Sequence, residues 1–138
     1  MSRLIVSAPG KAFLIGEYAV LAGATALVTA VGRRAVAQVC DDPERPPPSP
    51  LTEAAYAHVR QHLSAETGLK APGPLASVDT GAFAAGARKL GLGSSAAAAA
   101  AVVGYHLAEA GLDLEAADVR ALALRLATAA HAQVQGGG

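Results

Sequence analysis

The chain has 138 residues, a formal net charge of zero and 52% hydrophobic residues. The charge balance gives no electrostatic reason to expect binding to nucleic acid or to an anionic membrane. This length predicts one domain or part of a larger one, and the single cysteine, Cys40, excludes an internal disulfide framework. Because the N-terminus also lacks the long apolar core of a signal peptide, we expect a soluble, cytoplasmic protein.

Short apolar runs near the N-terminus predict an antiparallel meander. Residues 7–10 (Ser-Ala-Pro-Gly) predict a turn between the first two strands, and Lys11 follows it directly. A lone lysine at the start of a strand is usually a solvated charge, but binding residues are often placed between glycine turns. Both interpretations of Lys11 stay open at this point. The predicted strands cover residues 4–6, 12–15, 19–21, 26–31 and 33–39.

Residues 41–50 differ sharply from what precedes them, because five of the eight prolines fall there. Proline removes a backbone donor, so this segment predicts an extended surface loop, either a spacer or a ligand for a polyproline-binding protein. Thr52 is then the predicted N-cap of a helix that runs to about Glu66. The apolar stripe of that helix comprises Ala55, Val59 and Leu63.

A glycine-rich turn opens into an alanine-rich helix in the second half of the chain. Residues 75–80 predict a strand that leads toward this turn, and six consecutive alanines predict a buried helix from Ser94 to about Ala110. The first turn of a helix carries unpaired N–H groups and the positive end of the peptide dipole. Gly91 and Gly93 lack a Cβ, so a bulky anion can approach the backbone closely. The turn therefore predicts a phosphate-binding site.

Two well-known nucleotide motifs do not fit this turn. The dinucleotide fingerprint needs an acidic residue at the end of the next strand, whereas Asp113, at about the right distance, follows a helix. The common P-loop needs a Gly-Lys-Ser/Thr sequence that the turn lacks. What remains is a phosphate-binding loop with two serines in place of the lysine, or a turn that binds nothing.

A last helix is predicted from about Leu114 to Val134, with Asp113 as its cap. Gln135 and three glycines follow it. A domain seldom ends in this way, so we expect residues 135–138 to begin a loop that contacts substrate or phosphate, with a cloning scar or a flexible end as alternatives. The inward stripe of the helix is predicted to be Val119, Leu122, Leu126 and Ala129.

Three separated blocks resemble the GHMP small-molecule kinases. SAPGKAFLIGEYAVL at residues 7–21 resembles their first motif, and KLGLGSSAA at 89–97 resembles their ATP-binding motif. AHAQVQG at 130–136 resembles the segment that leads, in phosphomevalonate kinases, into Ser-Gly-x-Asp. Mevalonate kinases usually have a histidine where this chain has Tyr18, and a metal-binding glutamate near the place of His131. The resemblance therefore favours the phosphomevalonate kinases, with the mevalonate kinases next.

The resemblance implies that residues 1–138 form the N-terminal α/β (α+β) half of a two-lobed kinase, with a mixed sheet packed by helices. It also implies ATP and Mg²⁺ as cofactors and a small molecule as acceptor. Ser95 would ligate Mg²⁺, and Lys11 would be catalytic by stabilising charge on the transferred phosphoryl group. The implied ATP-binding residues are Lys89, Gly91, Leu92, Gly93, Ser94, Ser95 and Ala96, and the implied substrate-binding residues are Lys11, Glu17, Tyr18, His131 and Gln135.

Some of these roles have alternatives. Glu17 fits better as a residue that orders the first motif than as one that does chemistry, and His131 equally fits as a cap of its own helix. The family's catalytic aspartate would fall just beyond Gly138, and a C-terminal lobe would follow. We therefore expect this chain to bind ATP weakly and to transfer phosphate poorly or not at all by itself. A non-catalytic nucleotide-binding module and an alanine-rich structural domain remain the alternatives, and the oligomeric state stays open.

Overall fold

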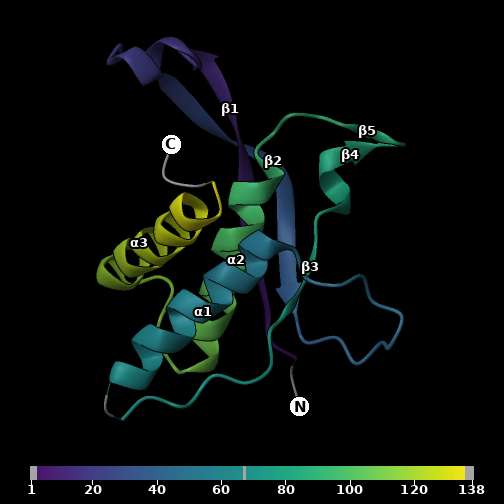
Figure 1. Ribbon diagram of the computed structural model, residues 1–138, viewed down its shortest axis with the longest axis vertical. Coiled ribbons are helices and arrows are strands. Elements are labelled where there is room, and N and C mark those ends of the chain that lie inside the picture. Colours follow the sequence, from purple (N-terminus) through teal and green to yellow (C-terminus); the bar gives the residue numbers. More distant parts are fainter. Residues whose placement is uncertain (1–2, 67, 136–138) are drawn as a thin grey trace.

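The computed structural model describes residues 3–66 and 68–135, which form a sheet with three helices on one side (Figure 1). The α+β class expected from the sequence is confirmed. The expected mixed sheet is not found, because every strand pair in the described residues is antiparallel. The main sheet has the order β1 (Ile5–Ile15), β2 (Leu27–Gln38), β3 (Ser77–Asp79), and β4 (Ala84–Ala85) pairs with β5 (Arg88–Lys89). The helices are α1 (Pro50–Ala65), α2 (Ser94–Glu109) and α3 (Ala117–Val134).

Strand β1 runs without a break through the turn predicted at residues 7–10, so that prediction and the separate strand at 12–15 were wrong. The pairing of β1 with β2 shifts register between Pro9 and Lys11, so residues 31–33 of β2 lie opposite Gly10 alone. A bulge of this kind keeps the strand continuous while it changes its twist. Gly10 is required for close packing, because an added Cβ would collide with the Leu92 carbonyl and the Phe83 ring.

The outer part of the β1–β2 hairpin extends beyond the helices and carries a short helix at its end (Figure 1). Residues 19–21 were predicted as a strand, but Ala19–Ala22 form a 3-10 helix between Gly16 and Gly23, which both have positive φ angles. These two left-handed glycines reverse the chain within a few residues, which leaves no room for a strand. The predicted strands 26–31 and 33–39 are one strand, β2, because β1 pairs along both of them.

The proline-rich segment is a loop between β2 and α1, as predicted. Helix α1 begins earlier than expected. Ser49 is the N-cap, its Oγ accepts from the Thr52 backbone N–H at 3.2 Å, and Pro50 occupies the first helical position, where its missing donor costs nothing. The predicted N-cap, Thr52, is instead buried in the first turn.

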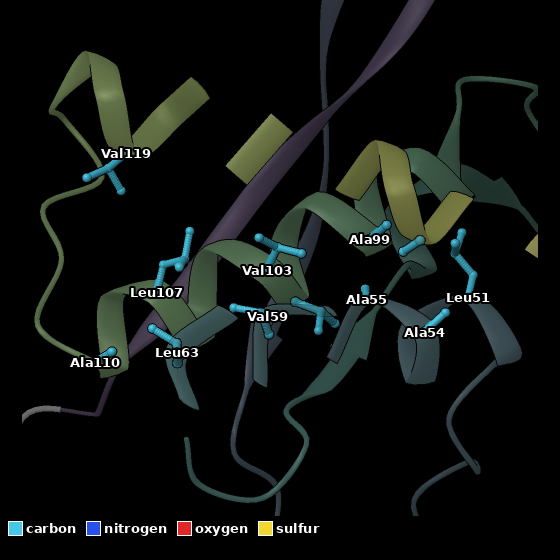
Figure 2. Close-up of a cluster of buried hydrophobic side chains, with 12 residues drawn as sticks. Leu51, Ala54, Ala55, Val59, Leu63, Ala99, Val103, Leu107, Ala110 and Val119 are labelled. Atoms are coloured by element: carbon cyan, nitrogen blue, oxygen red, sulfur yellow. The ribbon is translucent and has the colours of Figure 1, made fainter. Parts of the chain in front are cut away.

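Helix α2 occupies the centre of the molecule, as its apolar composition predicted. One of its faces packs against β1 and β2, and the opposite side contacts α1 and α3. Val59 and Leu63 of α1 join Val103 and Leu107 of α2 in one buried cluster (Figure 2). Small alanines on α2 let the sheet and the neighbouring helices come close to its axis, so this helix fixes where its own N-terminus lies relative to β1.

Helix α3 begins after the predicted start, at Ala117. Asp113 does not cap it, because its Oδ1 accepts from the Glu115 N–H at 3.0 Å within the preceding turn. The inward stripe is largely as predicted: Val119 is buried and Leu122 and Leu126 pack against the core, but Ala130 is the fully buried alanine. Strand β3 is also shorter than the predicted 75–80 strand, because it pairs with β2 over three residues only.

A buried histidine fastens the segment before β3 to α2. His106 is fully buried, its Nε2 accepts from the Ala76 N–H at 3.3 Å, and its Nδ1 therefore donates to Glu109 Oε2 at 3.0 Å. The same carboxylate accepts from the Gly73 N–H at 3.0 Å, and the Tyr56 hydroxyl donates to the Gly73 carbonyl at 2.8 Å. Burial lowers the pKa of His106, and the hydrogen bond to Glu109 opposes this shift only in part. No sequence pattern indicated this network.

Within the described residues, no helix combines the length and the apolar character that crossing a bilayer requires. The prediction that residues 135–138 begin a ligand-contacting loop falls mostly on residues 136–138, which lie outside the described residues.

Candidate functional site

A cavity of about 340 Å³ lies where β1, β5, α2 and α3 converge. Every residue that the resemblance implied for ATP binding lines this cavity. Lys11 and His131, which come from opposite ends of the chain, line it as well. The lining residues are Lys11, Phe83, Lys89, Gly91, Leu92, Gly93, Ser94, Ser95, Ala96 and His131.

The glycine-rich turn is anchored to β1 by a backbone hydrogen bond. The Lys11 N–H donates to the Leu92 carbonyl at 2.8 Å. Gly91 and Gly93 flank that carbonyl with φ angles of 69° and 73°, a region that side chains with a Cβ rarely adopt. The two glycines thus allow the turn to fold back against the strand edge and then enter α2.

The first turn of α2 presents backbone N–H groups that have no hydrogen-bond partner among the described residues. The first hydrogen bond of the helix runs from the Ala97 N–H to the Gly93 carbonyl. The amides of Ser94, Ser95 and Ala96 therefore come before the first N–H to C=O hydrogen bond within the helix. The N-cap, Gly93, has no side chain that could accept a hydrogen bond from them. With the helix dipole behind them, these three amides are suited to bind an anion.

Lys11 brings its charge to the same cavity. Its aliphatic stem lies across the turn, since a Cβ added to Gly93 would be 2.9 Å from Lys11 Cγ. Its ammonium group lies 4.2 Å from the centre of the Phe13 ring. Across the part of the chain that the structure describes, no lysine or arginine forms a salt bridge, so no carboxylate among these residues neutralises Lys11.

His131 is the contribution of α3 to the cavity, and it lies in the last turn of that helix. Ala130, its neighbour, is fully buried and fixes this end of α3 in the core. Gln135 is exposed and lies outside the cavity lining, with its Nε2 3.4 Å from His131 Nε2. The structure thus brings His131 to the predicted site and leaves Gln135 at its margin.

Glu17 and Tyr18 lie apart from the cavity, in the turn that follows β1. Tyr18 is 80% exposed. Two of the three first-motif residues predicted to contact substrate are therefore on the projecting hairpin and do not line the cavity with Lys11 and His131.

Phe83 lines the cavity although no sequence pattern pointed to it. It is 3% exposed and packs against Gly10, while its backbone carbonyl accepts from the Leu90 N–H at 2.9 Å. The small hairpin of β4 and β5 returns the chain from Phe83 to Lys89, and so places that lysine at the cavity. The sequence offered one clue, since the chain contains only two phenylalanines and Phe83 stands shortly before the glycine-rich turn.

The chemistry of the lining suits a polyanion. Among the described residues it contains two lysines, a histidine, two serine hydroxyls and the backbone amides of the first turn of α2, and none of these side chains is a carboxylate. Triphosphate oxygens match these donors. Mg²⁺ in nucleotide sites is held largely by phosphate oxygens and water, so one protein hydroxyl such as that of Ser95 is a suitable ligand. No group of three or more His, Cys, Asp or Glu side chains in the described residues is arranged to hold a metal by itself.

A larger cavity, of about 560 Å³, lies between the proline-rich loop and β3. It lacks the glycine-rich turn and Lys11, so we place the candidate site at the smaller cavity. Asp79 lines the larger cavity, and its Oδ1 accepts from the Gly81 N–H at 2.8 Å.

No family model matches the sequence, and no curated protein matches it. The fold is similar to that of a solved structure described as a Lin0012 protein from Listeria innocua, with a TM-score of 0.75 and 28% sequence identity. The similarity covers 99% of this chain and 44% of the Listeria chain. This chain therefore spans less than half the length of that protein, and the similarity supports the α+β fold described above.

Proposed function

We propose that this chain binds the phosphates of Mg²⁺–ATP at the 340 Å³ cavity and contributes the ATP-binding half of a GHMP-type small-molecule kinase. One observation supports the proposal above all others. Lys11, the glycine-rich turn and the first turn of α2 surround one cavity, although Lys11 is far from the others in the sequence. A phosphoryl-transfer site needs this combination of backbone donors and a positively charged side chain around the phosphates.

Each of these groups has a definite task in the proposed reaction. The amides of Ser94, Ser95 and Ala96 bind phosphate oxygens, and the dipole of α2 stabilises their charge. Lys11 meets the phosphoryl group that is transferred and stabilises the charge that builds up on it. Ser95 contributes its hydroxyl to Mg²⁺, which neutralises the phosphates when it is bound.

The proposed acceptor is phosphomevalonate, with mevalonate as the alternative. Lys89 and His131 line the same cavity as Lys11 and add a second ammonium group and an imidazole to it. An acceptor that carries its own phosphate offers more anionic oxygens to Lys89 and His131 than mevalonate, whose one anionic group is a carboxylate.

A non-catalytic nucleotide-binding module is the second candidate function. It is favoured by the absence of any carboxylate among the described residues that line the cavity, since no side chain of that kind is there to take a proton from the accepting group. The module and the kinase require the same phosphate site and differ in whether transfer follows binding.

Calorimetry with ATP and Mg²⁺ tests the phosphate site. We expect the wild-type chain to bind and Lys11→Met, which keeps the aliphatic stem, to bind at least about ten-fold more weakly, as a lost charge-assisted contact implies. Lys70→Met is the matched control, because Lys70 is exposed and lines neither cavity. Absence of binding by the wild type, or equal binding by Lys11→Met, would contradict the proposal.

Release of ADP with phosphomevalonate or mevalonate present then separates the two candidates. Turnover that depends on Lys11 and requires an acceptor supports the kinase and identifies the acceptor. Binding of ATP without turnover supports the module.

A further inference from the structure

The ammonium group of Lys11 lies over an aromatic ring of its own strand. Its Nζ is 4.2 Å from the centroid of the Phe13 ring, well within the range of a cation–π interaction. Phe13 itself is partly buried and does not line the cavity. The ring therefore contacts the lysine from outside the site, and its contact with any bound ligand would be through Lys11.

The backbone of β1 makes this contact possible. Lys11 pairs with Ala30 and Phe13 pairs with Val28, in a regular stretch of ladder between two register shifts. Residues two apart in a regular strand point to the same face, so the lysine and the ring lie on one face of the hairpin. The small side chain of Ala30, directly opposite Lys11, leaves space for the lysine to lie along the strand.

The stem of Lys11 is also held at its other end. Its N–H is bonded to the Leu92 carbonyl, and its Cγ and Cε pack over Gly93. A lysine fixed at the backbone and along the stem retains freedom mainly at its ammonium group. The Phe13 ring restricts that last freedom without neutralising the charge, as a carboxylate partner would.

We propose that Phe13 is a positioning residue for Lys11, an inference that rests on the proposed function. The face of its ring holds the lysine ammonium at the edge of the phosphate site before the ligand arrives. An anion then meets a charge that is already in place, and less side-chain entropy is lost on binding. A ring that competed with the anion for Lys11 would have the opposite effect on affinity.

NMR of the lysine side chains tests the contact without any nucleotide. The chain has only three lysines, Lys11, Lys70 and Lys89, so their ε-methylene signals can be assigned from single substitutions. We expect the Lys11 signals to be shifted upfield by the ring in the wild type and in Phe13→Tyr, and to lose that shift in Phe13→Leu. A wild-type Lys11 signal without an upfield shift would overturn the proposal.

Affinity for inorganic tripolyphosphate tests the role. Phe13→Leu keeps an apolar side chain but removes the ring, and we expect it to bind about two- to five-fold more weakly, whereas Phe13→Tyr restores wild-type affinity. Unchanged or tighter binding by Phe13→Leu overturns the role of Phe13 alone. Failure of the wild type to bind tripolyphosphate overturns the proposed phosphate site, and with it the role of Phe13.

Discussion

The Lys11 amide donates a hydrogen bond to the Leu92 carbonyl at 2.8 Å and so joins the opening strand to the glycine-rich turn. The bond places the side chain of Lys11 across Gly93, at the N-terminus of α2. A strand that only passed near the turn would leave the lysine free to point elsewhere. The relative position of Lys11 and Leu92 thus determines whether the side chain of Lys11 lines the cavity.

Gly93→Ala is expected to weaken ATP binding and to destabilise the fold. An alanine there must adopt a φ near 73°, at a cost of about 1–2 kcal/mol, and its Cβ would press on Lys11 Cγ. Gly91→Ala is the matched control, since it has nearly the same φ but nothing within 4 Å of its added Cβ. Urea unfolding should show similar losses for both variants, and calorimetry should show a larger loss of ATP affinity for Gly93→Ala. Equal affinity losses would mean that the stem of Lys11 is not part of the site.

Ser95→Ala is expected to reduce the contribution of Mg²⁺ to ATP binding. If the Ser95 hydroxyl ligates the ion, its removal should lower ATP affinity about ten-fold in the presence of Mg²⁺ and much less in the presence of EDTA. Ser94→Ala provides the comparison, because its hydroxyl lies on the same turn of α2 but has no proposed metal role. A loss that is the same with and without Mg²⁺ would assign Ser95 to phosphate binding instead.

Stability is expected to fall as the pH drops below about 6.5, because of His106. Burial lowers the pKa of His106 in the folded protein below its unfolded value, so between these two values the unfolded chain binds more protons. Neutral His106 contributes fully to the free energy of unfolding when the pH is above the pKa of the histidine in the unfolded chain. As the pH falls from there toward the pKa of His106 in the folded protein, the free energy of unfolding decreases by up to about 1.4 kcal/mol per pH unit. Urea unfolding of wild type and His106→Gln at pH 7.5 and 5.5 measures this difference. The variant should lose less stability between the two values, and an equal loss would assign the pH dependence to other groups.

Leu107→Ala is expected to destabilise the fold strongly, because Leu107 is fully buried where α1, α2 and α3 meet. Removing its side chain leaves a cavity and should cost about 2–5 kcal/mol of unfolding free energy. Leu124→Ala makes the same chemical change on α3 at a site that is 69% exposed, and we expect a loss of less than about 0.5 kcal/mol. Thermal or urea unfolding compares the two directly, and similar losses would show that α2 is not the centre of the core.

Predictions from local patterns were the most successful. The alanine run and the stripe of Ala55, Val59 and Leu63 predicted two of the three helices closely, because helix propensity and the 3.6-residue period act between neighbours. The proline-rich loop followed from the absence of backbone donors. The strand predictions were poorer. The Pro9-Gly10 pair is typical of a turn, but Gly10 lies inside the continuous strand β1, where the absence of a Cβ allows Leu92 and Phe83 to pack closely against it.

The entry of the glycine-rich turn into α2 could thus be predicted from the sequence alone, since it depends on a few adjacent residues, while anion binding at this turn stays a prediction. Tertiary structure decided the rest. Lys11, Phe83 and His131 share the cavity because β1, the β4–β5 hairpin and α3 all pack around α2, and Glu17 and Tyr18 lie outside it because their hairpin projects away. Contacts between residues far apart in the chain depend on strand register and helix packing, which no short stretch of sequence encodes by itself.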